Sequence, residues 1–198
     1  SVRDRLLHHA IYRILYPYFD KKFISDSYSC RLNKGTHRAL NRFRYFSRKV
    51  SKNNTKQCFI LKCDIKKFFA SIDHNLLRYI VVNYIKDEDI NWLLGQIIES
   101  FETSPGKGLP LGNLTSQLLV NIYMNEFDQF MKHKLKAKHY IRYADDFIFL
   151  SNDRQKLTHM RHGVNMFLGW VHFPKHRVLR ATTKRRMLKN LSVKSRSS

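Results

Sequence analysis

The apolar residues of the chain recur at helical spacing in four segments. Residues 2–19 predict an amphipathic helix that ends near Pro17, because proline interrupts helices. Asn75 to Ile85 and Glu88 to Phe101 have the same periodicity and predict two packed helices. Thr115 to Leu135 predicts a longer helix. Helices are therefore expected to form much of the fold.

Three other runs are short, apolar and β-favouring. Cys58 to Cys63 runs directly into Asp64, which places this carboxylate at the end of a strand. His139 to Tyr143 and Phe147 to Ser151 flank Ala144-Asp145-Asp146. Two strands around so short a connection predict a hairpin with the acidic pair at its tip.

The remaining segments lack a clear helical period. Ser25 to Asn41 is polar and is interpreted as a functional loop, and Ser47 to Gln57 as a basic surface connection. Ser104 to Pro110 is dense in Gly and Pro, and Asn165 to Phe173 is a further strand candidate. The tail beyond Pro174 contains no acid and nine basic residues: Lys175, Arg177, Arg180, Lys184, Arg185, Arg186, Lys189, Lys194 and Arg196.

The charge of the chain points to a polyanionic partner. Lys and Arg total 37 against 15 Asp and Glu among 198 residues, a formal net charge of +22. Such an excess is typical of nucleic-acid binding. The basic tail and Met131 to Lys138 are candidates to follow nucleic-acid phosphates. An anionic membrane is the alternative polyanion, but no apolar run approaches the roughly 20 residues of a spanning helix.

The cysteines and the first residues indicate a cytoplasmic protein. Cys30, Cys58 and Cys63 form neither an even disulfide framework nor a paired metal knuckle, so they are expected to be small core residues. The opening residues 1–5 lack the apolar segment of a secretory signal.

Asp145 and Asp146 are unusual because acids are scarce in this chain. Two adjacent carboxylates repel each other unless a cation compensates, although Asp also favours ordinary solvated turns. If the strand before Asp64 lies beside the hairpin, three carboxylates converge. Hard oxygen ligands suit Mg²⁺, and two ions about 3.5 to 4 Å apart can clamp the attacking and leaving oxygens of phosphoryl transfer. The chemistry indicated is nucleotidyl transfer.

Several motifs then give the chain a family resemblance. Leu61 to Asp73 resembles the first catalytic motif of reverse transcriptases, and Tyr143-Ala144-Asp145-Asp146 resembles their Tyr-x-Asp-Asp box. Gly108 to Gln117 resembles the motif between them. Ser27 to Leu40 is similar to the fingers motif of group II intron enzymes, and Gly163 to Trp170 to the primer grip. The resemblance spans nearly the whole chain in the family's order.

Two positions resemble one subfamily in particular. Leu111 stands where many relatives have Gln, and the motif ends in Thr-Ser-Gln at Gln117, as in the bacterial reverse transcriptases of diversity-generating retroelements. Leu can only pack where Gln can hydrogen-bond near the incoming nucleotide. The hypothesis is that Leu111 contributes to error-prone copying opposite template adenines; the alternative is a neutral hydrophobic variant.

The resemblance implies roles for individual residues at the metal centre. Asp64 and Asp145 are expected to coordinate two Mg²⁺ ions, with Mn²⁺ as an alternative. Asp146 is expected to be a further ligand or an electrostatic supporter, and the Ile65 carbonyl to add an oxygen.

Other residues are expected to hold substrates. Phe69 occupies the position of a steric gate against 2′-hydroxyls; the alternative is an ordinary core residue after a strand. The expected nucleotide-binding residues are Arg31, Lys34, Lys66, Lys67, Phe68, Phe69, Leu111, Gly112 and Gln117. The expected template-primer residues are Asn113, Phe167, Leu168, Gly169 and Trp170.

The chain departs from the family pattern after the hairpin. Relatives continue through a helix and a lysine-bearing segment, whereas here only Arg154 to His162 separates the hairpin from Gly163. That element is expected to be missing, and the thumb to be truncated.

The sequence therefore predicts an α+β right-hand polymerase fold with an antiparallel palm sheet, helical and loop fingers and a truncated thumb. Residues 1–57 are expected to form the N-terminal helix and fingers, and residues 58–153 the palm with interleaved fingers helices. Residues 154–198 are expected to form a shortened connection, the primer-grip strand and the start of the thumb.

The predicted function is RNA-directed DNA synthesis in a diversity-generating retroelement. Its expected partners are template RNA, primer or cDNA, deoxynucleotides and an accessory variability protein. The alternatives are a retron or group II intron-type reverse transcriptase, and a catalytically inactive RNA-binding module.

Overall fold

The computed structural model describes residues 2–170, 176–178 and 182–183. Most of the basic tail and the predicted truncated thumb lie outside these residues. The chain divides into two compact units, each assembled from separate segments. The first unit comprises residues 1–25, 66–130 and 168–175, and the second comprises residues 26–65, 131–167 and 176–198.

The first unit is helical, and the four helices predicted for it are confirmed. Asp73, Asp87 and Asn113 cap three of them by accepting a hydrogen bond from a backbone N–H of the first turn. The helices of this unit are α1 (Val2–Asp20), α3 (Phe68–Ser71), α4 (His74–Tyr84), α5 (Glu88–Glu99) and α6 (Leu114–Gln129). A π-helical turn, η1 (Phe130–Lys134), follows α6 in the chain, and all but its first residue belong to the second unit.

The first helix runs past Pro17 to Asp20, so the predicted end near Pro17 was wrong. Proline inside a helix costs about 3 kcal/mol. The residues beyond it make contacts that oppose this cost. Phe19 is only 1% exposed and meets the Tyr84 ring of α4 edge to face at 5.5 Å, and the Tyr18 hydroxyl donates to the Tyr84 carbonyl. Tertiary packing therefore keeps the last turn helical.

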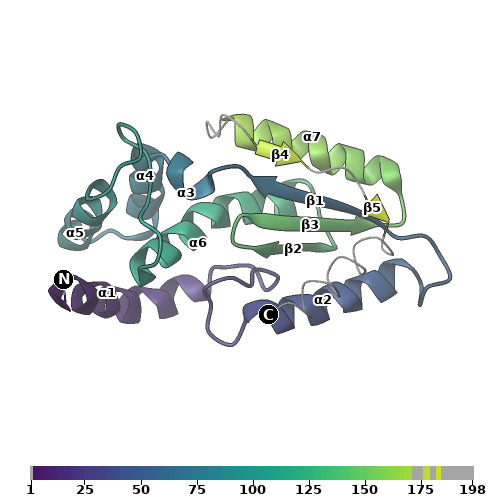
Figure 1. Ribbon diagram of the computed structural model, residues 1–198, viewed down its shortest axis with the longest axis horizontal. Coiled ribbons are helices and arrows are strands. Elements are labelled where there is room, and N and C mark those ends of the chain that lie inside the picture. The colour runs from purple at the N-terminus through teal and green to yellow at the C-terminus, as the bar shows by residue number, and fades with distance from the viewer. Residues whose placement is uncertain (1, 171–175, 179–181, 184–198) are drawn as a thin grey trace. The chain divides into compact units, whose positions relative to one another are not determined.

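The second unit contains a five-stranded antiparallel sheet, visible in Figure 1. Strand β1 lies between β3 and β4, and β2 flanks β3, which gives the order β2-β3-β1-β4; β5 also pairs with β1. The predicted hairpin and the predicted neighbouring strand are both confirmed. The strands are β1 (Phe59–Ile65), β2 (Tyr140–Tyr143), β3 (Asp146–Ser151), β4 (His176–Val178) and β5 (Thr182–Thr183).

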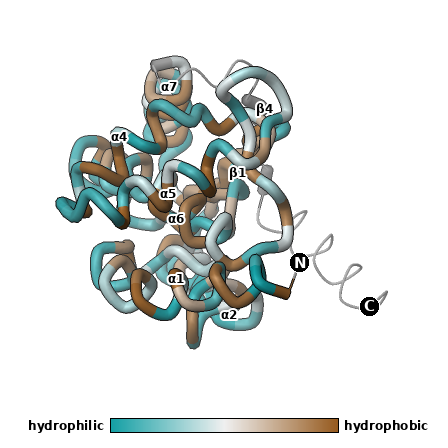
Figure 2. Tube along the Cα trace, turned by 90° about the vertical axis from the view of Figure 1, so that its left-hand side faces the viewer, coloured by the Kyte–Doolittle hydropathy of each residue, from teal (hydrophilic) through white to brown (hydrophobic). Residues whose placement is uncertain are grey.

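Helix α2 (Gly35–Val50) covers one face of this sheet. Its buried residues Phe43, Phe46 and Val50 recur at helical spacing and form a core with Ile60 and Ile141 of the sheet. Brown and teal stretches alternate along the helices in Figure 2, as expected of helices with one buried face. The apolar stripe of α2 anchors it to the sheet.

The sequence interpretation did not predict helix α2. The helix begins inside the predicted loop Ser25 to Asn41 and ends inside the predicted connection Ser47 to Gln57. Its many basic residues concealed a narrow apolar stripe that is buried only because the sheet lies against it.

A helix also follows the hairpin, which corrects two predictions. Helix α7 (Arg154–Trp170) follows the hairpin, so the helix that was expected to be missing is present, whereas the absence of the lysine-bearing segment stays a prediction. The strand predicted at Asn165 to Phe173 was wrong for residues 165–170, and residues 171–173 lie outside the described part of the chain. Leu157 and Val164 are buried seven residues apart, on one helical face, which favours a helix over a strand.

The cysteine prediction was right for two residues of three. Cys58 and Cys63 are buried, and burial raises the pKa of Cys63 to about 12, so it is a packed thiol. Cys30 is exposed. Among the described helices, none has the length and apolar character that crossing a membrane requires.

Candidate functional site

The register of β1 and β3 brings two of the predicted carboxylates to one end of the sheet. Cys63 pairs with Phe147, so Asp64 and Asp146 are the next residues of the two strands. Side chains alternate between faces along a strand, which places Asp64 and Asp146 on the same face as Lys62. Toward the opposite end of these strands, the same face is covered by α2.

The third carboxylate lies in the turn of the hairpin. Tyr143 pairs with Asp146, and Ala144 and Asp145 connect them. Ala144 has a φ of 54°, a left-handed conformation that non-glycine residues rarely adopt. Such strain costs on the order of 1–2 kcal/mol and persists only where surrounding contacts enforce it.

The electrostatics of the turn are unfavourable to a negative charge. Burial raises the pKa of Asp145, and the charges of Asp64 and Asp146 raise it further, against the opposing effects of a backbone hydrogen bond and Lys62. The Lys62 ammonium lies 3.0 Å from the Asp146 carboxylate. Lys62 therefore compensates part of the acidic charge.

The carboxylates fit a Mg²⁺ site that uses few protein ligands. Within residues 2–170, 176–178 and 182–183, no group of three or more His, Cys, Asp and Glu side chains is arranged to hold a metal ion. Mg²⁺ needs only one or two carboxylates when waters and substrate phosphates complete its shell. The crowded charge at Asp145 is consistent with such a role.

Arg142 is a site residue that the sequence interpretation missed. Its side chain is fully buried, donates to the Ala144 carbonyl at 3.0 Å and donates to the Ser27 hydroxyl at 2.9 Å. The first bond holds the carbonyl of the strained turn residue directly before Asp145. The signal available in the sequence was a lone arginine in an otherwise apolar strand.

The edge of the hairpin is held by a short segment around Ser27. The Arg142 backbone N–H donates to the Asp26 carbonyl at 2.9 Å, and the Tyr28 N–H donates to the Arg142 carbonyl at 3.0 Å. The Asp26 side chain is buried and accepts from Arg42 at 2.7 Å, a bond that raises the pKa of Arg42. Residues 26–28 therefore fix the hairpin strand from its open edge.

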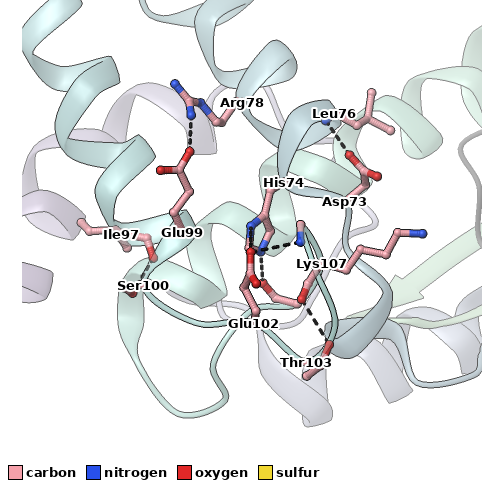
Figure 3. Close-up of polar contacts among 12 residues, drawn as sticks. Asp73, His74, Leu76, Arg78, Ile97, Glu99, Ser100, Glu102, Thr103 and Lys107 are labelled. Atoms are coloured by element: carbon pink, nitrogen blue, oxygen red, sulfur yellow. Dashed lines mark hydrogen bonds and ion pairs between the residues drawn. The ribbon is translucent and has the colours of Figure 1, made fainter.

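In the first unit, a tethered loop carries other predicted residues. The Leu109 N–H donates to the Phe69 carbonyl at 2.9 Å, which places the predicted steric gate beside the loop that leads to Leu111. The buried His74 ring nitrogen Nε2 lies 2.6 Å from the Gly108 carbonyl. Figure 3 shows His74 beside Glu102, with Thr103 and Lys107 of the loop close by. The loop is thus fixed to the start of α4.

The predicted nucleotide-binding residues of this loop differ in their environments. Leu111 is 75% exposed, so it has no packing role within its unit. Gly112 has a φ of 95°, which only glycine adopts readily. Asn113, predicted to contact template and primer, caps α6 by accepting from the Ser116 N–H at 2.6 Å. Gln117 is partly buried.

The remaining predicted residues lie in both units. Lys66 and Lys67 are exposed, whereas Phe68 is buried and Phe69 is partly buried. All four belong to the first unit, and the three carboxylates belong to the second. Ile65 is the last residue of β1. The Arg31 guanidinium donates to the Ser27 carbonyl, and the Lys34 ammonium lies over the Tyr28 ring. The predicted primer-grip residues are helical rather than extended: Phe167, Leu168, Gly169 and Trp170.

Replacing Gly108 by alanine should destabilise the loop more than the same change at Gly106. Gly108 has a φ of 117°, and an added Cβ would lie 2.9 Å from the Thr103 backbone nitrogen. Gly106 also has a positive φ, 68°, but no atom lies within 4 Å of its added Cβ. We expect a loss of about 3 kcal/mol for Gly108→Ala and about 1 kcal/mol for Gly106→Ala, measured by urea unfolding. Equal losses would show that the contact with Thr103 has no effect.

Comparisons with known proteins identify a matching family and several relatives. Residues 1–188 match the family described as Reverse transcriptase (RNA-dependent DNA polymerase). Retron Ec73 reverse transcriptase of Escherichia coli is 32% identical over 108 residues, 50% of this chain and 34% of the relative. Nuclear intron maturase 4, mitochondrial, of Arabidopsis thaliana is 31% identical over 135 residues, 65% of this chain and 16% of the relative. The match thus covers 34% of the length of the first relative and 16% of the second.

The fold is also similar to that of a solved polymerase structure. Apo telomerase from Candida tropicalis, truncated from its C-terminal domain, superposes with a TM-score of 0.63 and 15% sequence identity. The match covers 89% of this chain and 40% of that chain. This likeness confirms the predicted polymerase fold class.

Proposed function

The chain belongs to the reverse transcriptase family, and from this membership we propose that it extends a primer 3′-hydroxyl with deoxynucleotides on an RNA template. The observation that carries the proposal is the crowding of Asp64, Asp145 and Asp146 at one end of the sheet. Such crowding opposes folding unless the site serves a cation.

Asp64 and Asp145 would hold Mg²⁺, and Asp146, already paired with Lys62, would support them electrostatically. Bound Mg²⁺ activates the attacking hydroxyl and neutralises charge on the triphosphate. The protein's own contribution is positioning and electrostatics. Arg142 keeps the turn that presents Asp145 in its strained conformation.

Residues of the first unit would select the nucleotide. The exposed ammonium groups of Lys66 and Lys67 are available to triphosphate oxygens. Phe69, held by its carbonyl contact with Leu109, would act as the steric gate against a 2′-hydroxyl.

Primer extension on an RNA template tests the proposal. Purified protein is incubated with a labelled DNA primer annealed to RNA, with deoxynucleotides and Mg²⁺, and matched reactions contain a chelator. We expect extension that requires Mg²⁺ and favours deoxynucleotides over ribonucleotides. No extension under any metal condition would overturn the proposed activity.

We further propose that the copying is error-prone, as in a diversity-generating retroelement with an accessory variability protein. Support comes from Leu111, whose exposed apolar side chain can offer no hydrogen bond to a nascent base pair. Leu111→Gln should lower misincorporation opposite template adenines about 5-fold, the equivalent of one hydrogen bond of about 1 kcal/mol. Sequencing of the cDNA products measures this rate. Leu111→Met, which keeps an apolar side chain, is the control, and an unchanged error spectrum in Leu111→Gln would contradict the role.

An intron or retron type of reverse transcriptase is the second candidate. The identities to an intron maturase and to a retron reverse transcriptase favour it. The same cDNA sequencing separates the candidates, because an intron or retron enzyme should show no excess of errors at template adenines.

A further inference from the structure

The second unit contains a cavity at the end of the hairpin farthest from the catalytic turn. The cavity has a volume of about 990 Å³ and is lined by α2, by residues 135–139 before β2, by the end of β3 and by the start of α7. His139 and Ser151 mark this end of the hairpin, whereas Ala144 and Asp145 form the opposite end. The cavity is therefore separate from Asp64, Asp145 and Asp146, none of which lines it.

Positive charge dominates the lining of this cavity. Asp26 is the one carboxylate among the described lining residues, and it already pairs with Arg42 at 2.7 Å and Lys132 at 3.5 Å. The lining cations are Arg42, Lys49, Lys52, Lys132, Lys136, Lys138 and Lys156. Most of this charge has no carboxylate within the cavity to compensate it.

The positive charge of the lining also affects the pKa of His139. Burial lowers the pKa of His139, and the charges of Lys49, Lys132 and Lys138 lower it further. The cations therefore act at one place inside the cavity, not only as separate surface charges. Such a potential attracts anions.

The lining also offers an aromatic surface. Tyr45 is 51% exposed, and Phe46 beside it faces the cavity. The guanidinium of Arg42 lies 4.3 Å from the Phe46 ring centroid, and the ammonium of Lys49 lies 5.8 Å from that of Tyr45. Aromatic rings beside cations are the pattern with which proteins bind unpaired bases and their phosphates.

We propose that this cavity binds a short single-stranded segment of nucleic acid, with phosphates on its lysines and a base stacked on Tyr45. The cations come from several elements, which suits consecutive phosphates better than the single phosphate group of a free nucleotide. Its volume, at the upper limit of small-molecule sites, also exceeds what one nucleotide needs. The site would let the protein hold a strand at a place other than the polymerising centre.

The test measures binding of a fluorescent, unstructured 12-nucleotide RNA by anisotropy at several salt concentrations. The variant Lys49→Gln/Lys138→Gln/Lys156→Gln should bind about 10-fold more weakly. Its slope of log affinity against log salt should fall by about 2, since each lost contact to a single strand contributes about 0.7.

A matched control removes the same charge away from the cavity. Lys21, Lys56 and Lys86 are exposed and do not line it. The triple substitution of these lysines by Gln should change affinity less than 3-fold. If both triple variants bind equally weakly, net charge rather than the cavity explains binding, and the proposal is wrong.

Tyr45→Ala tests the stacked base, and crosslinking tests the location. We expect Tyr45→Ala to weaken RNA binding about 10-fold and to leave the affinity for inorganic tripolyphosphate unchanged. RNA containing 4-thiouridine should crosslink to the α2 peptide with Tyr45. The proposal is wrong if Tyr45→Ala binds RNA as tightly as the unsubstituted protein does. It is also wrong if all crosslinks fall on peptides other than that of α2. The same measurement with a DNA 12-mer of matching sequence shows whether the site prefers RNA. If both oligonucleotides bind more weakly than tripolyphosphate does, the proposal of a nucleic-acid site is also wrong. None of these measurements depends on polymerase activity.

Discussion

Asp145→Asn is expected to reduce Mg²⁺-dependent primer extension about 1,000-fold. The substitution keeps the size of the side chain but removes the charge at the turn of the hairpin, where Asp64 and Asp146 also act. Loss of one group that stabilises charge in a transition state costs about 10²- to 10³-fold in rate. Single-turnover extension on an RNA template measures the rate of the chemical step.

The same substitution should have the opposite effect on stability. Without metal, Asp145→Asn removes repulsion among the carboxylates, so its free energy of unfolding should exceed that of the unsubstituted protein. Added Mg²⁺ should stabilise the unsubstituted protein and not the variant. Thermal unfolding with and without Mg²⁺ measures both effects.

Asp89→Asn is the matched control, since Asp89 is exposed in the first turn of α5. It should leave the extension rate within about 2-fold of the original, because it lies outside the carboxylate cluster. If Asp145→Asn also retained a rate within 10-fold, the assignment of Asp145 as a catalytic metal ligand would be wrong.

Arg142→Met is expected to destabilise the protein by about 3 kcal/mol. The change leaves the Ala144 carbonyl and the Ser27 hydroxyl without the donor that each has now. A buried polar group left unsatisfied costs about 1–3 kcal/mol. For a protein of this size, the melting temperature should fall by about 6–12 °C. Arg161→Met, at an exposed position of α7, should change it little.

Arg142→Lys separates positioning of the turn from stability. Lysine keeps the charge but lacks the fork of donors that reaches both Ala144 and Ser27. If Arg142 positions the turn, the variant should need several-fold more Mg²⁺ for half-maximal extension at a temperature at which it remains folded. Rates lowered with an unchanged Mg²⁺ requirement would indicate a structural role alone.

The local pattern of the sequence was enough for most individual elements. The apolar runs before Asp64 and around Asp145 predicted strands correctly, and helical periodicity predicted α4, α5 and α6. Prediction failed where tertiary contacts outweighed local signals. Burial of Phe19 keeps α1 helical beyond Pro17, and packing against the sheet buries the apolar residues along one side of α2. Asn165 and the residues after it were predicted to form a strand, whereas residues 165–170 belong to helix α7, in which Leu157 and Val164 are buried at helical spacing.

The sequence by itself determined the family of this protein, because Asp64, Asp145 and Asp146 stand in motifs whose residue types and order resemble those of reverse transcriptases. The tertiary structure decided how those residues are supported. The pairing of β1 with β3 set Asp64 and Asp146 on one face, and the buried Arg142 holds the strained turn that carries Asp145. The assembly of a basic cavity from α2, the hairpin and α7 was likewise visible only in the fold. The amino-acid sequence shows which charged residues are present. How deeply they are buried and how far apart they lie depend on contacts between segments that are distant in the sequence.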